Sequence, residues 1–319
     1  MSELVRKATR EGYGETLVEL CKTCPDLVVL DADLAAATKT GIFAKAQPDR
    51  FFNCGIQEAN MMGVAAGLAA SGKLVFASSF AMFAAGRAFE IIRNSIAYPN
   101  LNVKIGATHA GISVGEDGAS HQCNEDIALM RVLPNMTIIN PADDVETRAA
   151  MLAMASHKGP VYLRFGRLPV PVFNDKDSYK FELGKGIQLR GGDSEKKDDV
   201  AIIATGLMVA EALEAYDELA GQGINARIIN IHTIKPIDRD IIVKAANETG
   251  KVITVEEHSV IGGLGSAVCD FLSECCPVPV KKIGIEDAFG YSGPALELLK
   301  EFGLSSENIV KVAKEFVGK

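Results

Sequence analysis

The sequence has no hydrophobic run of the ~18 residues that a membrane-spanning helix needs, which argues against an integral membrane protein. It has no excess of positive charge either. Its 33 Lys and Arg residues stand against 41 Asp and Glu, a formal net charge of −8, whereas nucleic-acid surfaces are basic. The chain starts in a polar helical pattern, so we expect no signal peptide. These features predict a cytoplasmic protein that binds neither membrane nor nucleic acid.

Cysteine is present, but not in the pattern of a metal site. The seven cysteines, an odd number in a long chain, indicate free thiols in a reducing compartment. Cys21 and Cys24 form a C-x-x-C pair, yet no second pair or histidine cluster completes a zinc site, and we interpret them as packing residues. Residues 262–265 read Gly-Gly-Leu-Gly, which lacks the full spacing of a dinucleotide-binding loop. We predict no metal ligands in this chain.

Apolar strands alternate with helical patterns along the whole chain. The 319 residues are 48% hydrophobic and 23% charged, enough for one large or two medium domains with a real core. Segments such as Leu27–Leu30 and Val103–Ala107 are apolar on both faces, which is typical of parallel sheets covered on both sides. Residues 174–198 are polar and break this rhythm. We predict two consecutive parallel-sheet α/β domains, over residues 1–175 and 199–319, joined by a linker with an edge strand over residues 176–198.

Glu58 stands at the start of an otherwise apolar helix of small residues. The nearest charged residues in the sequence are Arg50 and Lys73. A carboxylate in that much apolar surface is costly to bury, so it must face solvent, be paired or serve a task. An acid that simply favours the positive end of the helix dipole is the alternative. Its position alone leaves both readings open.

Polar residues follow the predicted strands of the first domain. In open α/β sheets the ligand sits at the carboxyl ends of the strands. Asp33 follows the first strand, His109 follows the third and Arg167 follows the last, so they should meet at one edge. The loop over residues 111–118 has three glycines and no helical pattern, and it leads to His121. Such a loop can approach a ligand closely.

Two aromatic residues accompany this edge. Phe80 and Phe83 lie three residues apart at the start of a predicted helix, so their rings are neighbours. Ordinary core packing explains such a pair by itself. Beside a flat heteroaromatic ligand, the same pair is a stacking platform.

Together these segments resemble the C-terminal half of transketolase, a thiamine-diphosphate-dependent family, over essentially the whole chain. Residues 55–58 (Gly-Ile-Gln-Glu) are similar to the segment that carries the family's cofactor-activating glutamate, and residues 32–35 (Ala-Asp-Leu-Ala) to a second segment. Residues 108–109 (Thr-His), 115–118 (Gly-Glu-Asp-Gly) and 121–122 (His-Gln) resemble the substrate loop. The resemblance implies a pyrimidine-binding domain followed by the family's C-terminal domain.

The resemblance also implies roles for individual residues. Glu58 would hydrogen-bond the pyrimidine ring of thiamine diphosphate and favour its imino tautomer, while the rings of Phe80 and Phe83 pack on it. The activity implied is transfer of a two-carbon ketol unit from a ketose to an aldose. The catalytic residues would then be Glu58, His109 and His121. The substrate-binding residues would be Arg10, Asp33, His109, Asp117, His121 and Arg167, with the two arginines gripping a sugar phosphate.

The chain departs from the family pattern in two places. Ala37 stands where many transketolases have a serine near the phosphate. The family also binds the diphosphate and magnesium through a Gly-Asp-Gly segment of an N-terminal domain, and this chain has no equivalent. Residue 1 starts at the pyrimidine-domain helix. We therefore expect one subunit of a split transketolase. The N-terminal partner subunit would hold magnesium or calcium, and a homodimer of this chain would lie within an α2β2 assembly.

Three alternatives remain. A beta subunit of a two-oxoacid dehydrogenase and the corresponding half of deoxyxylulose-phosphate synthase both share the activating glutamate. His109 favours transketolase over the synthase, whose loop usually lacks it, and the dehydrogenase loop matches less well over residues 115–118. The third is a non-catalytic binding or regulatory homologue, against which the intact Glu58 and aromatic pair argue.

Overall fold

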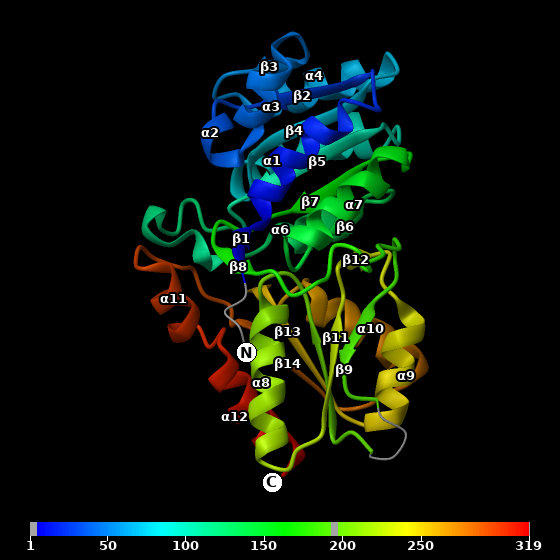
Figure 1. The fold of residues 1–319 in the computed structure, drawn as a ribbon, viewed down its shortest axis with the longest axis vertical. Coiled ribbons are helices and arrows are strands. Elements are labelled where there is room, and N and C mark those ends of the chain that lie inside the picture. The colour runs from blue at the N-terminus through cyan, green and yellow to red at the C-terminus, as the bar shows by residue number, and fades with distance from the viewer. Residues whose placement is uncertain (1–4, 193–196, 319) are drawn as a thin grey trace.

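The computed structural model describes residues 5–192 and 197–318, so residues 193–196 of the predicted linker lie outside the described residues. Two sheets lie one beyond the other along the long axis of the molecule (Figure 1). The first has seven strands in the order β12-β6-β7-β5-β4-β2-β3, and the second has five in the order β14-β13-β10-β11-β9. A two-stranded ribbon, β1 (Arg6–Ala8) with β8 (Pro169–Pro171), lies near their junction.

The strands of the first sheet are β2 (Leu27–Asp31), β3 (Phe51–Asn53), β4 (Leu74–Phe80), β5 (Val103–Thr108), β6 (Thr137–Ile139), β7 (Val161–Arg164) and β12 (Thr233–Lys235). Those of the second are β9 (Ile187–Arg190), β10 (Val200–Ala204), β11 (Ala226–Asn230), β13 (Val252–Ser259) and β14 (Val280–Ile285). All pairs in the first sheet are parallel except β12–β6, and all in the second except β9–β11. The predicted α/β fold with two parallel-sheet units is confirmed.

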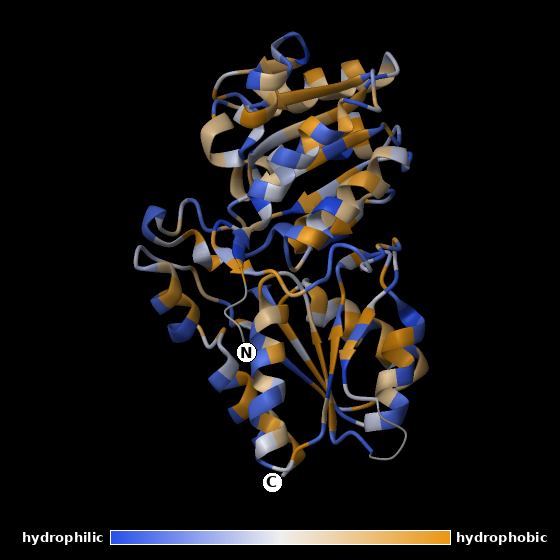
Figure 2. Cartoon of the chain, in the orientation of Figure 1, coloured by the Kyte–Doolittle hydropathy of each residue, from blue (hydrophilic) through white to orange (hydrophobic). Residues whose placement is uncertain are grey.

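Helices cover both faces of each sheet, because inner strands such as β2 and β10 are buried and largely apolar on both sides (Figure 2). The helices of the first unit are α1 (Thr9–Leu20), α2 (Ala35–Thr38), α3 (Thr40–Ala46), α4 (Glu58–Ala70), α5 (Phe89–Ile91), α6 (Asp126–Arg131) and α7 (Asp144–Ser156). Those of the second are α8 (Met208–Gly221), α9 (Arg239–Thr249), α10 (Leu264–Cys275), α11 (Ala295–Glu301) and α12 (Ser306–Val317). No helix among the described residues is both long and apolar enough to cross a membrane.

The structure differs from the sequence-based expectations in several short segments. The helix predicted to start at Phe80 and Phe83 contains two π-helical segments, η2 (Met82–Arg87) and η3 (Ile92–Ala97), around α5. The loop predicted to be non-helical holds a 3-10 helix, η4 (Ile112–Asp117), broken at Gly115. A 3-10 turn, η1 (Pro48–Arg50), precedes β3. These segments of three to six residues are too short for a hydrophobic period of their own to be recognised in the sequence.

Candidate active site

The predicted site residues gather at the carboxyl edge of the first sheet. Strands β4 and β5 are parallel neighbours, and their registered partners Phe80 and Thr108 are the last residues of each strand. The residue after Thr108 is His109, which adopts a left-handed backbone with φ of +56°. Parallel register therefore places the ring of His109 beside that of Phe80.

Four predicted residues form an aromatic cluster at this edge. The His109 ring stacks on Phe80 with centroids 3.9 Å apart, and the Phe83 ring also stacks on Phe80, with centroids 5.9 Å apart. His121 approaches Phe83 edge-on, with centroids 5.2 Å apart and an interplanar angle of 77°. Phe83 is half-buried, so part of its surface stays available. The structure thus brings together both aromatics and both loop histidines.

The surroundings of His109 keep its imidazole neutral. Burial is the main cause, and the nearby positive charges of Arg10 and Arg167 act in the same direction, so the pKa falls to about 3. The Thr108 hydroxyl lies 3.0 Å from its Nδ1. A neutral imidazole can donate through one ring nitrogen and accept through the other, which suits hydrogen bonds to sugar hydroxyls.

Glu58 is the first residue of α4, and its side chain is only 7% exposed. The turn before it uses Gly55, at φ of +70°, where the chain leaves β3 for the helix. Ser79, near the end of β4, donates a hydroxyl hydrogen bond to Glu58 Oε1 at 3.5 Å. One long hydrogen bond uses little of the accepting capacity of a carboxylate. The Glu58 carboxylate can therefore accept hydrogen bonds from a further donor.

Arg10 and Arg167 lie next to each other across the ends of α1 and β7. Arg10 donates to the Arg167 carbonyl at 3.3 Å and to the Ala37 carbonyl at 2.6 Å. Arg167 donates to the Val114 carbonyl and to Glu116 Oε2, the latter at 2.8 Å. Both arginines are half-buried, and burial lowers the pKa of Arg10. Glu116, a partner of Arg167 that the sequence-based prediction did not include, neighbours the predicted Asp117.

The two predicted aspartates are exposed. Asp33 has a left-handed backbone, with φ of +65°, and accepts a hydrogen bond from the Asn53 amide at 2.8 Å. Asp117 lies exposed at the end of η4. Asn53 was not predicted as a site residue, because no spacing along the chain links it to Asp33. Asp31, by contrast, is fully buried, and the hydroxyls of Thr38 and Thr40 donate to it, so it holds the turn after β2.

Among the described residues, no group of three or more His, Cys, Asp or Glu side chains is placed to hold a metal ion. All seven cysteines are free thiols, and the Cys21 side chain is a packing residue buried in the hydrophobic core of the first unit. The described residues therefore supply no cage of carboxylate oxygens for a hard cation.

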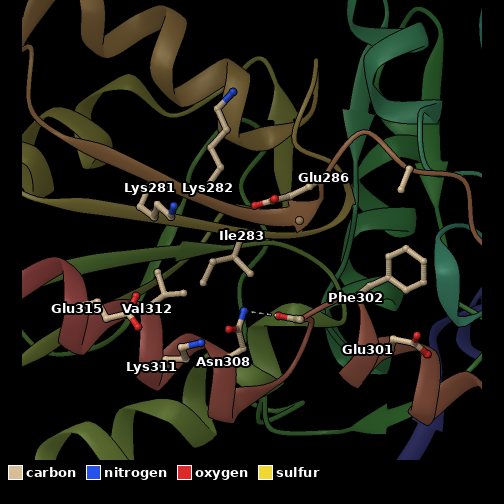
Figure 3. Close-up of a pocket in the computed structure, with 13 residues that line it drawn as sticks. Lys281, Lys282, Ile283, Glu286, Glu301, Phe302, Asn308, Lys311, Val312 and Glu315 are labelled. Atoms are coloured by element: carbon tan, nitrogen blue, oxygen red, sulfur yellow. Dashed lines mark hydrogen bonds between the residues drawn. The ribbon is translucent and has the colours of Figure 1, made fainter.

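A separate cavity of about 410 Å³ lies in the second unit between β14, α11 and α12 (Figure 3). Three lysines and three glutamates line it, so their formal charges cancel. One of the lysines, Lys282, points out of it and donates to the Val260 carbonyl and the Ser266 hydroxyl. None of the predicted site residues lines this cavity.

Comparison with known proteins agrees with this architecture. Residues 6–171 match the family described as transketolase, pyrimidine binding domain, and residues 193–309 match transketolase, C-terminal domain. A putative transketolase C-terminal section from Methanocaldococcus jannaschii is 54% identical, with 96% of this chain and 95% of that protein covered. A 6-deoxy-6-sulfo-D-fructose transketolase subunit from a Clostridium species is 45% identical, with 96% and 93% covered. A solved structure described as a split gene transketolase, inactive beta4 tetramer, has a TM-score of 0.89 at 55% identity and covers 98% of each chain.

Proposed function

The chain belongs to the transketolase family, and from that premise we propose that it is the C-terminal subunit of a two-chain, thiamine-diphosphate-dependent transketolase. The proposed reaction transfers a two-carbon ketol unit from a ketose to an aldose. The observation that carries the proposal is the meeting of Glu58, the Phe80–Phe83 pair and the two loop histidines at one sheet edge. The two relatives named above support it, since each is covered nearly in full and its name describes a section or a subunit of transketolase.

The residues present fit the pyrimidine end of thiamine diphosphate. The cofactor supplies the carbanion chemistry when it is bound. Glu58 would accept and share the proton of a ring nitrogen, protected from water by its burial, and Phe83 would offer the ring surface for stacking. His109 and His121 would hydrogen-bond and orient the sugar hydroxyls, His109 in its neutral form.

The other end of the cofactor would be held by the partner. A diphosphate with a divalent cation needs hard oxygen ligands, and we assign magnesium or calcium binding to an N-terminal subunit that carries the diphosphate-binding domain. The isolated chain should therefore bind thiamine diphosphate weakly and be inactive. The seven free thiols support the cytoplasmic location proposed for both subunits.

Besides the contact with the N-terminal subunit, the exposed surface of helix α4 suits a contact between two copies of this chain. Its exposed face carries Gly63, Val64 and Gly67, and a Cβ added at either glycine meets nothing within 4 Å. The segment leading into the helix exposes Phe52 and Ile56 as well, with 45% and 76% of their surfaces accessible. An apolar helix face with small residues suits close packing against another helix. We propose a homodimer through α4 within an α2β2 enzyme.

Sugar phosphates are the proposed substrates, with Arg10 and Arg167 facing the terminal phosphate. Ala37 offers this group no hydroxyl, and its carbonyl already accepts from Arg10. One relative of this chain is named for a sulfonated sugar. The terminal anion is thus the substrate feature to vary first, with phosphorylated, sulfonated and uncharged ketose donors compared in one assay.

The test of the proposal is reconstitution. This chain is mixed with the N-terminal subunit of the same organism, thiamine diphosphate and magnesium, and ketol transfer between sugar phosphates is measured beside pyruvate consumption. We expect ketol transfer by the mixture and none by either chain alone. Pyruvate turnover without ketol transfer would instead support the dehydrogenase or synthase alternative.

A further inference from the structure

The loop between the two histidines rests on the second unit of the chain. Its glycines Gly111, Gly115 and Gly118 all have left-handed backbones, with φ of +86°, +80° and +77°. A Cβ at Gly111 would lie 2.3 Å from the Glu257 carboxylate, and one at Gly118 would lie 2.4 Å from the Ser292 hydroxyl. At Gly115 it would meet the Gly293 carbonyl at 3.3 Å. The glycines therefore allow a close approach between this loop and the second unit.

Glu257 holds the first half of the loop. It lies near the end of β13, is 3% exposed, and its Oε1 accepts the backbone N–H of Ser113 at 2.7 Å. The Glu257 carbonyl accepts from Arg164 Nη2 at 2.9 Å, and Arg164 pairs with Asp126 of the first unit at 2.9 Å. A buried, charge-assisted bond from the second unit thus fixes the backbone four residues after His109.

Gln122 holds the other end of the loop. Its side chain is 3% exposed, and its amide donates to the carbonyls of Ile112, Gly115 and, in the second unit, Tyr291, at 3.3, 3.1 and 3.0 Å. Its carbonyl oxygen lies against Gly290, where an added Cβ would stand 2.0 Å away. His121 directly precedes Gln122, so these hydrogen bonds of Gln122 also fix the position of the His121 backbone.

We infer that Glu257 is a positioning residue through which the second unit shapes the substrate loop and sets affinity for the sugar, with Gln122 as its counterpart at the other end. This inference rests on the proposed function, because the proposed function assigns His109 and His121 to sugar binding. It gives the C-terminal unit a specific part in substrate binding, although none of the residues assigned to the cofactor or the sugar comes from it.

The test compares Glu257→Ala with a matched control, Glu256→Ala. Glu256 is also a buried carboxylate of β13, but it accepts the N–H groups of Leu264 and Gly265 at the start of α10, inside the second unit. In the two-chain enzyme we expect Glu257→Ala to raise KM for the sugar donor about tenfold or more, with kcat changed less than about threefold. Glu256→Ala should leave KM unchanged, and Glu257→Gln, which keeps an acceptor for Ser113, should restore most of the affinity.

Amide hydrogen exchange in the chain alone gives a second readout. Residues 111–122 should exchange faster in Glu257→Ala than in the unsubstituted chain or in Glu256→Ala. Equal exchange in the two variants, or faster exchange without a rise in KM, would overturn the inference. If Glu257→Ala does not fold, Gly290→Ala takes its place. Residue 290 lies in neither sheet, and a Cβ there would displace the side-chain amide of Gln122, so KM should rise similarly. Absence of ketol transfer in the unsubstituted two-chain enzyme would refute the proposed function instead, and the exchange data would still decide whether Glu257 orders the loop.

Discussion

The imidazole of His109 stacks on the phenyl ring of Phe80, with centroids 3.9 Å apart and planes tilted by 26°. This stack joins the two halves of the proposed site, because Phe80 belongs to the cofactor side and His109 to the sugar side. It also places the imidazole where burial, and then the positive charges of Arg10 and Arg167, disfavour its protonated form. The neutrality of His109 is therefore a built-in property of the site, and it can be measured.

His109 should stay neutral to low pH and make folding stability depend on pH. Its pKa falls from an ordinary 6.5 to about 3, so below pH 6.5 the unfolded chain binds a proton that the folded chain does not. Stability from this group is complete above pH 6.5 and falls as the pH drops, by about 1.4 kcal/mol per unit. We expect unfolding curves of His109→Asn to have a shallower dependence between pH 6.5 and 4.5. Identical slopes for the two proteins would contradict the shifted pKa.

Glu58→Gln should abolish ketol transfer by the two-chain enzyme and leave the fold intact. Glutamine keeps the shape of the side chain but cannot share a proton with the ring nitrogen, so we expect kcat to fall by at least about 100-fold. The loss of stability should be about 0.3–1 kcal/mol, the value of one acid in the first turn of a helix. Glu297→Gln, which removes an exposed first-turn acid from α11, is the control and should leave kcat unchanged. Normal turnover by Glu58→Gln would refute the catalytic role of Glu58.

Gly63→Leu should break the proposed contact between copies without harming the fold of each chain. A Cβ at Gly63 meets nothing within 4 Å, so leucine adds no clash inside one chain and improves helix propensity. In a packed interface the same side chain would hold the helices apart. Sedimentation velocity should show a smaller assembly for Gly63→Leu, and an unchanged one for Gly221→Leu, whose position in α8 is equally open. An unchanged assembly in Gly63→Leu would place the contact elsewhere.

Arg167→Lys tests the phosphate grip. Lysine keeps the charge but loses the planar fork that binds an anion with two parallel hydrogen bonds. We expect KM for a phosphorylated ketose to rise about tenfold, and KM for its unphosphorylated form to change little. Arg148→Lys, at an exposed pair with Glu19, is the matched control. Equal effects of Arg167→Lys on both donors would mean that the terminal anion binds elsewhere.

The sequence predicts the architecture better than the contacts of the site. Strands such as β2 are buried on both faces, so their apolar runs identify the sheets directly. The order of these strands then brings Phe80 and His109 together, as the carboxyl-edge argument expects. Strand β12 could not be predicted, because its three residues pair with β6, about 100 residues earlier in the chain.

The missed residues share one physical cause. Asn53, Glu116 and Glu257 each act through a partner far along the chain or on another element, which no local periodicity records. The glycines of the loop were expected to approach a ligand. In the structure Gly111 and Gly118 lie against the second unit, which a sequence pattern cannot distinguish from a ligand. The catalytic and binding roles of the site residues stay predictions until the variants above are measured.

Ketol transfer by the reconstituted pair of subunits tests the central claim most directly. The measurement follows aldehyde release from phosphorylated, sulfonated and uncharged ketose donors in the presence of an aldose acceptor, thiamine diphosphate and magnesium. We predict product formation that requires both chains and is lost with Glu58→Gln. A folded, assembled pair that binds thiamine diphosphate and yet transfers no ketol unit from any of the three donor types would contradict the account.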